Sequence, residues 1–216
     1  MDTNGAYQDL FVILMNKELK DGWYIEIGSN HPMNSNNSYI LENKYGWKGI
    51  MVELDGSFLQ LYKEIRPLAI PIIGDATQID YVSYLQNNNF PANLNYLQID
   101  VEADNKSTLD TIKLFDNSVF DHYKFGTVTF EHDIYRGDFF DTRSISREIF
   151  LKRGYVRLFS DVCVWVYNTW CPYEDWYVHP DIIDNDLIQK ILSDPENTEK
   201  IHTTTCIEII QRYLKK

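Results

Sequence analysis

The 216-residue sequence is poor in basic residues, in cysteine and in long apolar runs, and each shortage argues against a class of protein. With 20 Lys and Arg against 32 Asp and Glu, the net charge is −12. Such an acidic body repels phosphate backbones, so we expect no nucleic-acid partner. The three cysteines are odd in number and lack C-x-x-C spacing, which argues against structural zinc and disulfides and favours a reducing, cytoplasmic setting.

Apolar runs are short throughout the chain. None approaches the roughly 18 residues of a membrane span, so we expect no membrane partner. The run Leu10–Met15 lacks a basic flank before it, which favours an amphipathic helix within residues 1–20 over a signal peptide. The composition, 44% hydrophobic and 24% charged, is typical of a globular chain. We expect one domain over 1–216, with a helical extension at 181–216.

Seven short runs rich in β-branched and aromatic residues predict strands. They are Trp23–Ile27, Gly49–Leu54, Leu68–Ile73, Leu94–Ile99, Gly126–Phe130, Tyr155–Ser160 and Val162–Tyr167. Helix-length segments between them include Ser57–Ile65, Ile79–Asn87 and Ser107–Phe115, and two further helices are expected at Ile182–Ser193 and His202–Leu214. This alternation predicts an α/β, Rossmann-like sandwich with a mostly parallel seven-stranded sheet. Only Asp161 separates the last two strands, which predicts a C-terminal antiparallel hairpin.

Acidic residues follow the first five predicted strands. They are Glu26, Glu53 with Asp55, Asp75, Asp100 with Glu102, and Glu131 with Asp133. A single one is readily explained as a helix cap. Acidic residues at the ends of five successive strands are harder to explain as helix caps alone. In open α/β sheets, ligands bind outside the carboxyl ends of the strands. Mutual repulsion among carboxylates indicates a crevice that faces a cation, a metal or several hydroxyls.

Glycine is scarce in the first turn. The segment Gly28-Ser29-Asn30-His31-Pro32 has one glycine, and the next is Gly46, so the G-x-G-x-x-G cradle of a pyrophosphate is missing. This absence argues against a nucleotide-dependent oxidoreductase. A ligand with adenosine, no phosphate and a positive charge fits both the missing cradle and the carboxylates, and S-adenosylmethionine is such a molecule.

Each residue of the crevice then has a hypothetical role. Glu53 would accept the ribose hydroxyls, Asp75 would lie near the adenine amine, and Asp100 near the ammonium or the methyl group. Ser35 precedes a helix whose N-terminus could receive the carboxylate, although a plain capped loop is an equal alternative. The predicted cofactor-binding set is Glu26, Gly28, Ser29, Asn30, Ser35, Glu53, Leu54, Asp75, Ala76 and Asp100.

Several segments also resemble a family. They are GWYIEIGSNHP, SNNSYILENKYGWKGIMVELD, IIGDAT and NYLQIDVEAD, and they are similar to successive motifs of FkbM-type methyltransferases, which belong to the class I, Rossmann-like superfamily. The resemblance covers Gly22 to Tyr135 and extends toward Val178. His31-Pro32 and Ala103 depart from the family pattern.

The resemblance implies roles for particular residues. Glu26, Gly28, Asn30, Glu53 and Asp75 match cofactor-binding positions of the family, whereas Asp100 and Glu102 match the segment bordering the substrate. It also implies O-methylation of a hydroxyl on a sugar or small metabolite.

The chemistry needs a group that activates the acceptor hydroxyl. The candidate catalytic residues are Asp100, Glu131 and His132, with His132 as general base oriented by Glu131 or Asp133. The alternative is Mg²⁺ or Mn²⁺ held by Asp100, Glu131 and Asp133. A third interpretation leaves His132 as a brace within a loop.

The acceptor and the partners stay open. Tyr173–Tyr177 would stack on a sugar ring or anchor a loop after the hairpin, and Tyr135 with Arg136 would reach the anionic part of a nucleotide-sugar. We expect a small-molecule acceptor, a saccharide or nucleotide-sugar, and a monomer or a homodimer. A non-catalytic S-adenosylmethionine-binding module and a metal-dependent enzyme using the acidic crevice are the alternative functions.

Overall fold

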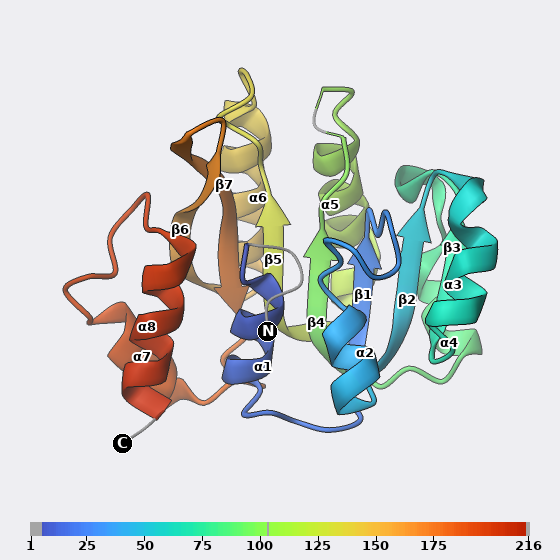
Figure 1. The fold of residues 1–216 in the computed structure, drawn as a ribbon, viewed down its shortest axis with the longest axis horizontal. Coiled ribbons are helices and arrows are strands. Elements are labelled where there is room, and N and C mark those ends of the chain that lie inside the picture. The colour runs from blue at the N-terminus through green and yellow to red at the C-terminus, as the bar shows by residue number, and fades with distance from the viewer. Residues whose placement is uncertain (1–5, 103, 215–216) are drawn as a thin grey trace.

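Seven strands form one sheet in the order β3-β2-β1-β4-β5-β7-β6 (Figure 1). The computed structural model describes residues 6–102 and 104–214, so Ala103 lies outside the described residues. The strands are β1 (Trp23–Ile27), β2 (Lys48–Glu53), β3 (Ala69–Ile73), β4 (Asn93–Ile99), β5 (Lys124–Glu131), β6 (Val156–Val166) and β7 (Thr169–Val178). β1 to β5 pair in parallel, and β7 is antiparallel to both β5 and β6. The order reverses between β1 and β4, which is the point where such sheets bind ligands.

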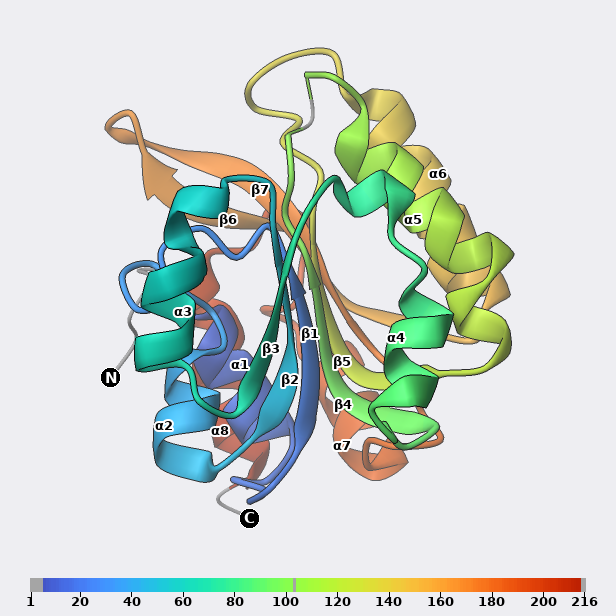
Figure 2. The ribbon, with the colours of Figure 1, turned by 90° about the vertical axis from the view of Figure 1, so that its right-hand side faces the viewer.

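Helices cover both faces of the sheet (Figure 2). α1 (Gln8–Met15), α2 (Tyr39–Tyr45), α3 (Leu59–Ile65) and α8 (Thr203–Leu214) pack on one face, together with α7 (Asn185–Leu192). α4 (Tyr81–Asn87), α5 (Ser107–Asn117) and α6 (Phe140–Lys152) pack on the other. Neighbouring strand residues alternate between the two cores: Tyr24 lies in the first and Ile25 in the second. None of the helices in the described parts of the chain is long and apolar enough to cross a membrane.

The predicted fold class is confirmed, but the hairpin is not where the sequence places it. The two predicted strands around Asp161 are one strand, β6, and the chain turns at Tyr167 and Asn168, both with positive φ. Asp161 also has a positive φ, of 51°, and the pairing with β7 shifts register beside it. A bulge of this kind interrupts the apolar pattern as a turn does. The segment Tyr173–Tyr177, expected after the hairpin, therefore lies within β7.

One helix is absent from the sequence-based prediction. In α6, two of the four buried residues are Thr142 and Ser146, beside Ile149 and Phe150. A helix whose inner face is half polar gives a weak apolar periodicity, so the sequence does not reveal it.

Candidate cofactor and acceptor cleft

A cleft of about 640 Å³ lies at the carboxyl ends of β1 to β5. Its volume is in the range of small-molecule sites. All ten residues of the predicted cofactor-binding set line it, namely Glu26, Gly28, Ser29, Asn30, Ser35, Glu53, Leu54, Asp75, Ala76 and Asp100. Glu131, Asp133, Arg136 and Tyr173 line the same cleft. The fold therefore brings together residues spread over more than half of the chain.

Gly28 brings the first turn against the end of β4. Its φ is +85°, and a Cβ built at this position would lie 1.6 Å from the carbonyl oxygen of Asp100. No other residue fits such a contact. The amides of Gly28 and Ser29 both donate to the carbonyl of Val52, at 3.0 Å each, which ties the turn to β2 as well. The single glycine of the turn is thus required by a close backbone approach.

Glu53 and Asp75 follow β2 and β3, and both carboxylates are fixed by backbone amides. Glu53 accepts from the amide of Asn30 at 2.7 Å and from the amide of Asp55 at 2.9 Å. Asp75 accepts from the amide of Thr77 at 2.9 Å, and this bond and that of the Thr77 hydroxyl lower the pKa of Asp75. Asp75 thus caps the short helical turn after it. Both oxygens of Glu53 and Oδ2 of Asp75 keep lone pairs for a ligand in the cleft.

Asp100 and Glu131 form an acidic pair in the deeper part of the cleft. Burial raises the pKa of Asp100. Burial, followed by the charge of Asp100, raises the pKa of Glu131 well above its usual range. Among the described residues, Glu131 Oε2 and Asp133 Oδ1 are buried and have no hydrogen-bond partner. The raised pKa values favour the neutral forms of Asp100 and Glu131, so the pair is suited to proton exchange with a ligand.

Arg136 is the one cation among the described residues that line the cleft. Its Nη1 lies 2.9 Å from Asp133, and its Nη2 lies 3.1 Å from Glu102 and 3.4 Å from Asp104. These carboxylates belong to two loops, after β4 and after β5, and Arg136 joins them. Because Arg136 is already neutralised by carboxylates, the geometry does not favour the predicted contact with an anionic acceptor group.

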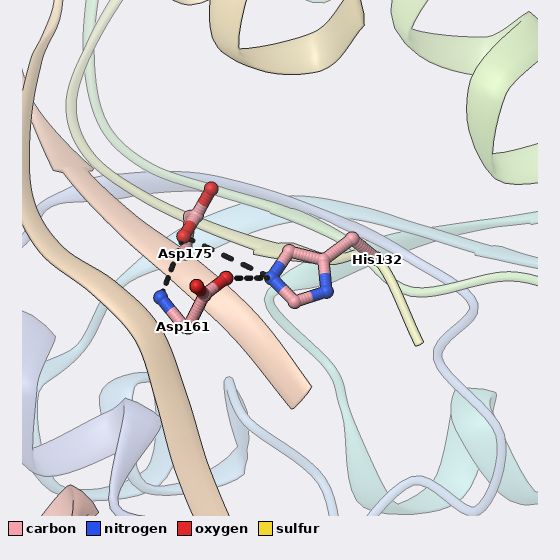
Figure 3. Close-up of side chains that lie close together, drawn as sticks. All are labelled: His132, Asp161 and Asp175. Carbon is pink, nitrogen blue, oxygen red and sulfur yellow. Dashed lines mark hydrogen bonds and ion pairs between the residues drawn. The ribbon is translucent and has the colours of Figure 1, made fainter. Parts of the chain in front are cut away.

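His132 does not line the cleft. Its side chain is fully buried, with Nε2 3.3 Å from Asp161 and 3.8 Å from Asp175 (Figure 3). The expectation that Glu131 or Asp133 orients His132 is therefore wrong. Burial lowers the pKa of His132, but hydrogen bonds and charges from Asp161 and Asp175 outweigh this effect and raise it.

His132, Asp161 and Asp175 are close enough in the described structure to suggest a metal site. Two arginines from α6 form ion pairs with these carboxylates instead. Arg143 Nε donates to Asp161 at 2.7 Å, and Arg147 donates to Asp161 at 2.6 Å and to Asp175 at 2.7 Å. Two guanidinium groups already neutralise two carboxylates, so this ion cluster offers nothing to a metal ion.

The metal set expected from the sequence has no support. Among the described residues, Asp100, Glu131 and Asp133 do not form a group with ligand atoms in mutual reach of one ion. The sequence analysis also missed the ion cluster of His132, Asp161, Asp175, Arg143 and Arg147, called here the rear cluster. A signal for it does exist: Asp161 interrupts an apolar strand, and Arg143 and Arg147 stand four residues apart on one helix face.

Comparisons with known proteins support the fold alone. No family model and no curated protein matches the chain. A TehB-like SAM-dependent methyltransferase from Corynebacterium glutamicum is similar in structure, with a TM-score of 0.50, 11% identity, and coverage of 82% of this chain and 89% of that one. Precorrin-6y C5,15-methyltransferase from Geobacter metallireducens is similar with a TM-score of 0.50, 13% identity, and coverage of 79% and 86%. At these identities the likeness establishes the fold: the chain has the Rossmann-like fold of class I methyltransferases.

Proposed function

We propose that this protein is an S-adenosylmethionine-dependent methyltransferase of the FkbM type that methylates a hydroxyl of a saccharide or small metabolite. The observation that carries the proposal is the cleft, lined by every residue of the predicted cofactor set. Its described lining holds eight Asp and Glu residues and one Arg. Such a surface suits a cationic adenosine compound and repels phosphate.

The cofactor half of the cleft matches the parts of this ligand. Glu53, fixed by two amides, presents its outer lone pairs to the ribose hydroxyls. Asp75 and Ala76 line the part of the cleft where the adenine would lie, and Gly28 lines the part where the methionine end would lie. When bound, S-adenosylmethionine supplies a methyl group on a cationic sulfur.

The acidic pair supplies the base. The carboxyl pair of Asp100 and Glu131 would accept the proton that the acceptor hydroxyl loses when its oxygen takes the methyl group. A raised pKa suits this task, because a general base works best when its pKa approaches the working pH. His132 has no part in this scheme, since its ring faces the ion cluster of Asp161 and Asp175.

Three tyrosine rings support a saccharide acceptor. Tyr173 lines the cleft, the Tyr135 ring lies 6.2 Å from it, and the Tyr167 ring, at the hairpin tip, lies 6.4 Å from Tyr135. Tyr167 is 82% exposed. Aromatic faces beside carboxylates suit a molecule that has apolar ring faces and many hydroxyls. The excess of carboxylates favours a saccharide without phosphate over a nucleotide-sugar.

A non-catalytic binding module remains the second candidate function. It would keep Glu53, Asp75 and the Gly28 turn, because these serve the cofactor. It has no need for two carboxyls with raised pKa values on the acceptor side, since burying a carboxyl such as that of Glu131 costs stability. The acidic pair therefore favours the enzyme.

Calorimetry tests the cofactor site. We expect S-adenosylmethionine and S-adenosylhomocysteine to bind and NAD not to bind, with no change on adding Mg²⁺ or a chelator. Glu53→Ala should weaken binding by about 1.5–3 kcal/mol for each hydrogen bond to the ribose that it removes. Glu64→Ala is the matched control, because Glu64 is exposed on α3 and outside the cleft. Folded wild-type protein that binds neither ligand would contradict the proposal.

Methyl transfer to a panel of saccharides tests the chemistry. Glu131→Gln should lower turnover by about 10²- to 10⁴-fold, the usual contribution of a general base, while its affinity for S-adenosylhomocysteine stays near that of the wild type. Cofactor binding without transfer to any hydroxyl compound would favour the binding module.

A further inference from the structure

Arg66 follows α3 and lies beneath the cleft without lining it. Its side chain is completely buried. Nε donates to Glu42 at 2.8 Å; Nη1 donates to the Pro32 carbonyl at 3.1 Å and to Asn36 Oδ1 at 2.8 Å. Nη2 donates to the Tyr24 hydroxyl at 2.8 Å and to the Ser38 hydroxyl at 2.7 Å. A guanidinium has five N–H donors, so every one is used.

Three of these five partners belong to the loop 28–38 between β1 and α2, called here the cofactor loop. The loop lines the cleft through Gly28, Ser29, Asn30, Ser35 and Asn37. The remaining partners of Arg66 are in β1 and α2, which are parts of the scaffold. Arg66 therefore joins the inner side of the loop to the body of the protein.

Glu26 completes a second layer of bonds under the same loop. Its carboxylate accepts from Asn36 Nδ2 at 3.0 Å, from the Asn37 amide at 3.0 Å and from the Ser38 hydroxyl at 2.7 Å. Asn36 and Ser38 thus bond to both Arg66 and Glu26. The three titratable side chains Glu26, Glu42 and Arg66 of this network are buried together, and burial raises the pKa of Glu26.

The backbone of the cofactor loop needs such support. Besides Gly28, Asn30 and Ser35 have positive φ values of 47° and 51°. Left-handed conformations of non-glycine residues cost about 1 kcal/mol or more each and persist where surrounding contacts impose them. The Tyr62 hydroxyl donates to the Asn30 carbonyl and so holds one of these residues, while the Arg66 network holds the segment that contains the other.

We infer that Arg66 is a positioning residue for the methionine end of the cofactor: it fixes the cofactor loop in its binding conformation and keeps Glu26 in place beneath it. This role rests on the proposed function. It predicts that Arg66 matters for the part of the ligand that the loop contacts. The adenosine part depends on Glu53, the last residue of β2, and on Asp75 after β3. Glu53 is held by the Asp55 amide outside the loop as well as by the Asn30 amide within it.

Two ligands distinguish binding of the methionine end of the cofactor from binding of its adenosine part. S-adenosylhomocysteine has the adenosine and the amino-acid end, whereas 5′-methylthioadenosine has the adenosine alone. For Arg66→Lys, which keeps the charge but loses the planar fork, we expect calorimetry to show affinity for S-adenosylhomocysteine weakened about tenfold or more. Affinity for 5′-methylthioadenosine should change far less. Amide hydrogen exchange should quicken within residues 28–38 specifically.

Arg153→Met is the matched control. Arg153 follows α6 and binds Asp116 and Asp121, away from the cleft. Its replacement should lower stability and leave both affinities unchanged. If Arg66→Lys does not fold, Tyr24→Phe removes one acceptor of Arg66 and should give the same selective loss in a weaker form.

The two possible failures are distinct. Wild-type protein that binds neither ligand would overturn the proposed function, and this role with it. Wild-type protein that binds both, with Arg66→Lys weakened equally toward both and exchange quickened throughout the chain, would overturn the role of Arg66 alone.

Discussion

Two pairs of carboxylates lie on opposite sides of the end of β5. Asp100 and Glu131 face the cleft, and their pKa values are raised. Asp161 and Asp175 lie behind it, and their pKa values are lowered, because hydrogen bonds from Arg143 and Arg147, together with the nearby His132, outweigh burial. The comparison shows that burial alone does not distinguish a functional acid from a structural one. In this protein, the pair away from the cleft is the one that has fixed cations.

The strand itself separates the two groups. Glu131 and Asp133 border the cleft, and His132 between them is directed into the rear cluster. Side-chain alternation directs His132 away from the cleft after Glu131, and the extended chain ends at Asp133, whose φ is positive at 55°. The amides of His132 and Asp133 both donate to the Tyr173 carbonyl, at 3.1 and 3.2 Å, which anchors the segment to β7. A functional residue and a structural one can thus be neighbours in sequence.

Loss of a rear carboxylate should have the largest effect on stability. Asp175 accepts from Arg147 Nε and Nη2, from the Asp161 amide and from the Tyr177 hydroxyl. Asp175→Asn leaves Arg147 partly buried without its full counter-charge, so we expect the free energy of unfolding to fall by about 3–5 kcal/mol in denaturant titrations. Asp133→Asn is the matched control and should cost under about 1 kcal/mol, because the partner of Asp133, Arg136, is partly exposed. Equal losses of unfolding free energy in the two variants would contradict the distinction between the rear carboxylates and those of the cleft.

Glu174 tests whether the lack of a cation is sufficient to raise a pKa. It is completely buried and accepts from Gln8 at 2.8 Å, and burial raises its pKa to about 8. Because the folded pKa is above the ordinary 4.5, the stability from Glu174 is complete below that pH and is lost as the pH rises through about 8.

Replacement of Glu174 should remove this loss. The free energy of unfolding of Glu174→Gln relative to the wild type should increase by about 1.4 kcal/mol per pH unit across that range. Denaturant titrations at several pH values measure it, and parallel curves for the two proteins would show that Glu174 is charged in the fold. Since Glu174 does not line the cleft, a raised pKa marks a functional acid only when the group also faces a ligand site.

The fold and the cofactor half of the cleft can be predicted because both depend on local patterns. Strand runs end in acids, and parallel strands bring their carboxyl ends to one edge. The turn at Gly28 can be predicted for the same reason, because it directly follows a strand. Each of these signals is complete within a few residues.

Local signals can mark single members of the rear cluster, but the sequence does not show which residues pair in it or in the Arg66 network, because the partners are distant in sequence. Arg66 and Glu42 are 24 residues apart, and Arg147 and Asp175 are 28 apart. No periodicity links such pairs. The direction of His132 was equally hidden: it depends on strand alternation at a strand end, together with Asp161, whose positive φ the sequence presented as a turn.

His132→Asn should have a smaller effect, of about 1 kcal/mol, on the free energy of unfolding. The pKa of His132 is raised by Asp161 and Asp175 against the effect of burial, so its stabilising contribution is complete below pH 6.5 and is lost as the pH rises through the folded value. The variant should therefore be less stable than the wild type at acid pH and converge with it at alkaline pH. Affinity for S-adenosylhomocysteine and turnover should not change. A loss of turnover without a change in stability would return His132 to the catalytic residues.

The smallest effect is expected for the acids in the cleft, and its sign is opposite. Glu131→Gln removes a carboxyl that burial and Asp100 make difficult to ionise, so the free energy of unfolding at neutral pH should rise slightly, by less than about 1 kcal/mol. Asp100→Asn should do the same, and the double variant should gain less than the sum, because the two carboxyls share one proton. Denaturant titrations of the wild type, the two single variants and the double variant measure this double-mutant cycle. A fall in stability as large as that of Asp175→Asn would mean that the acidic pair supports the fold, and the contrast between the two sides of β5 would then have no functional meaning.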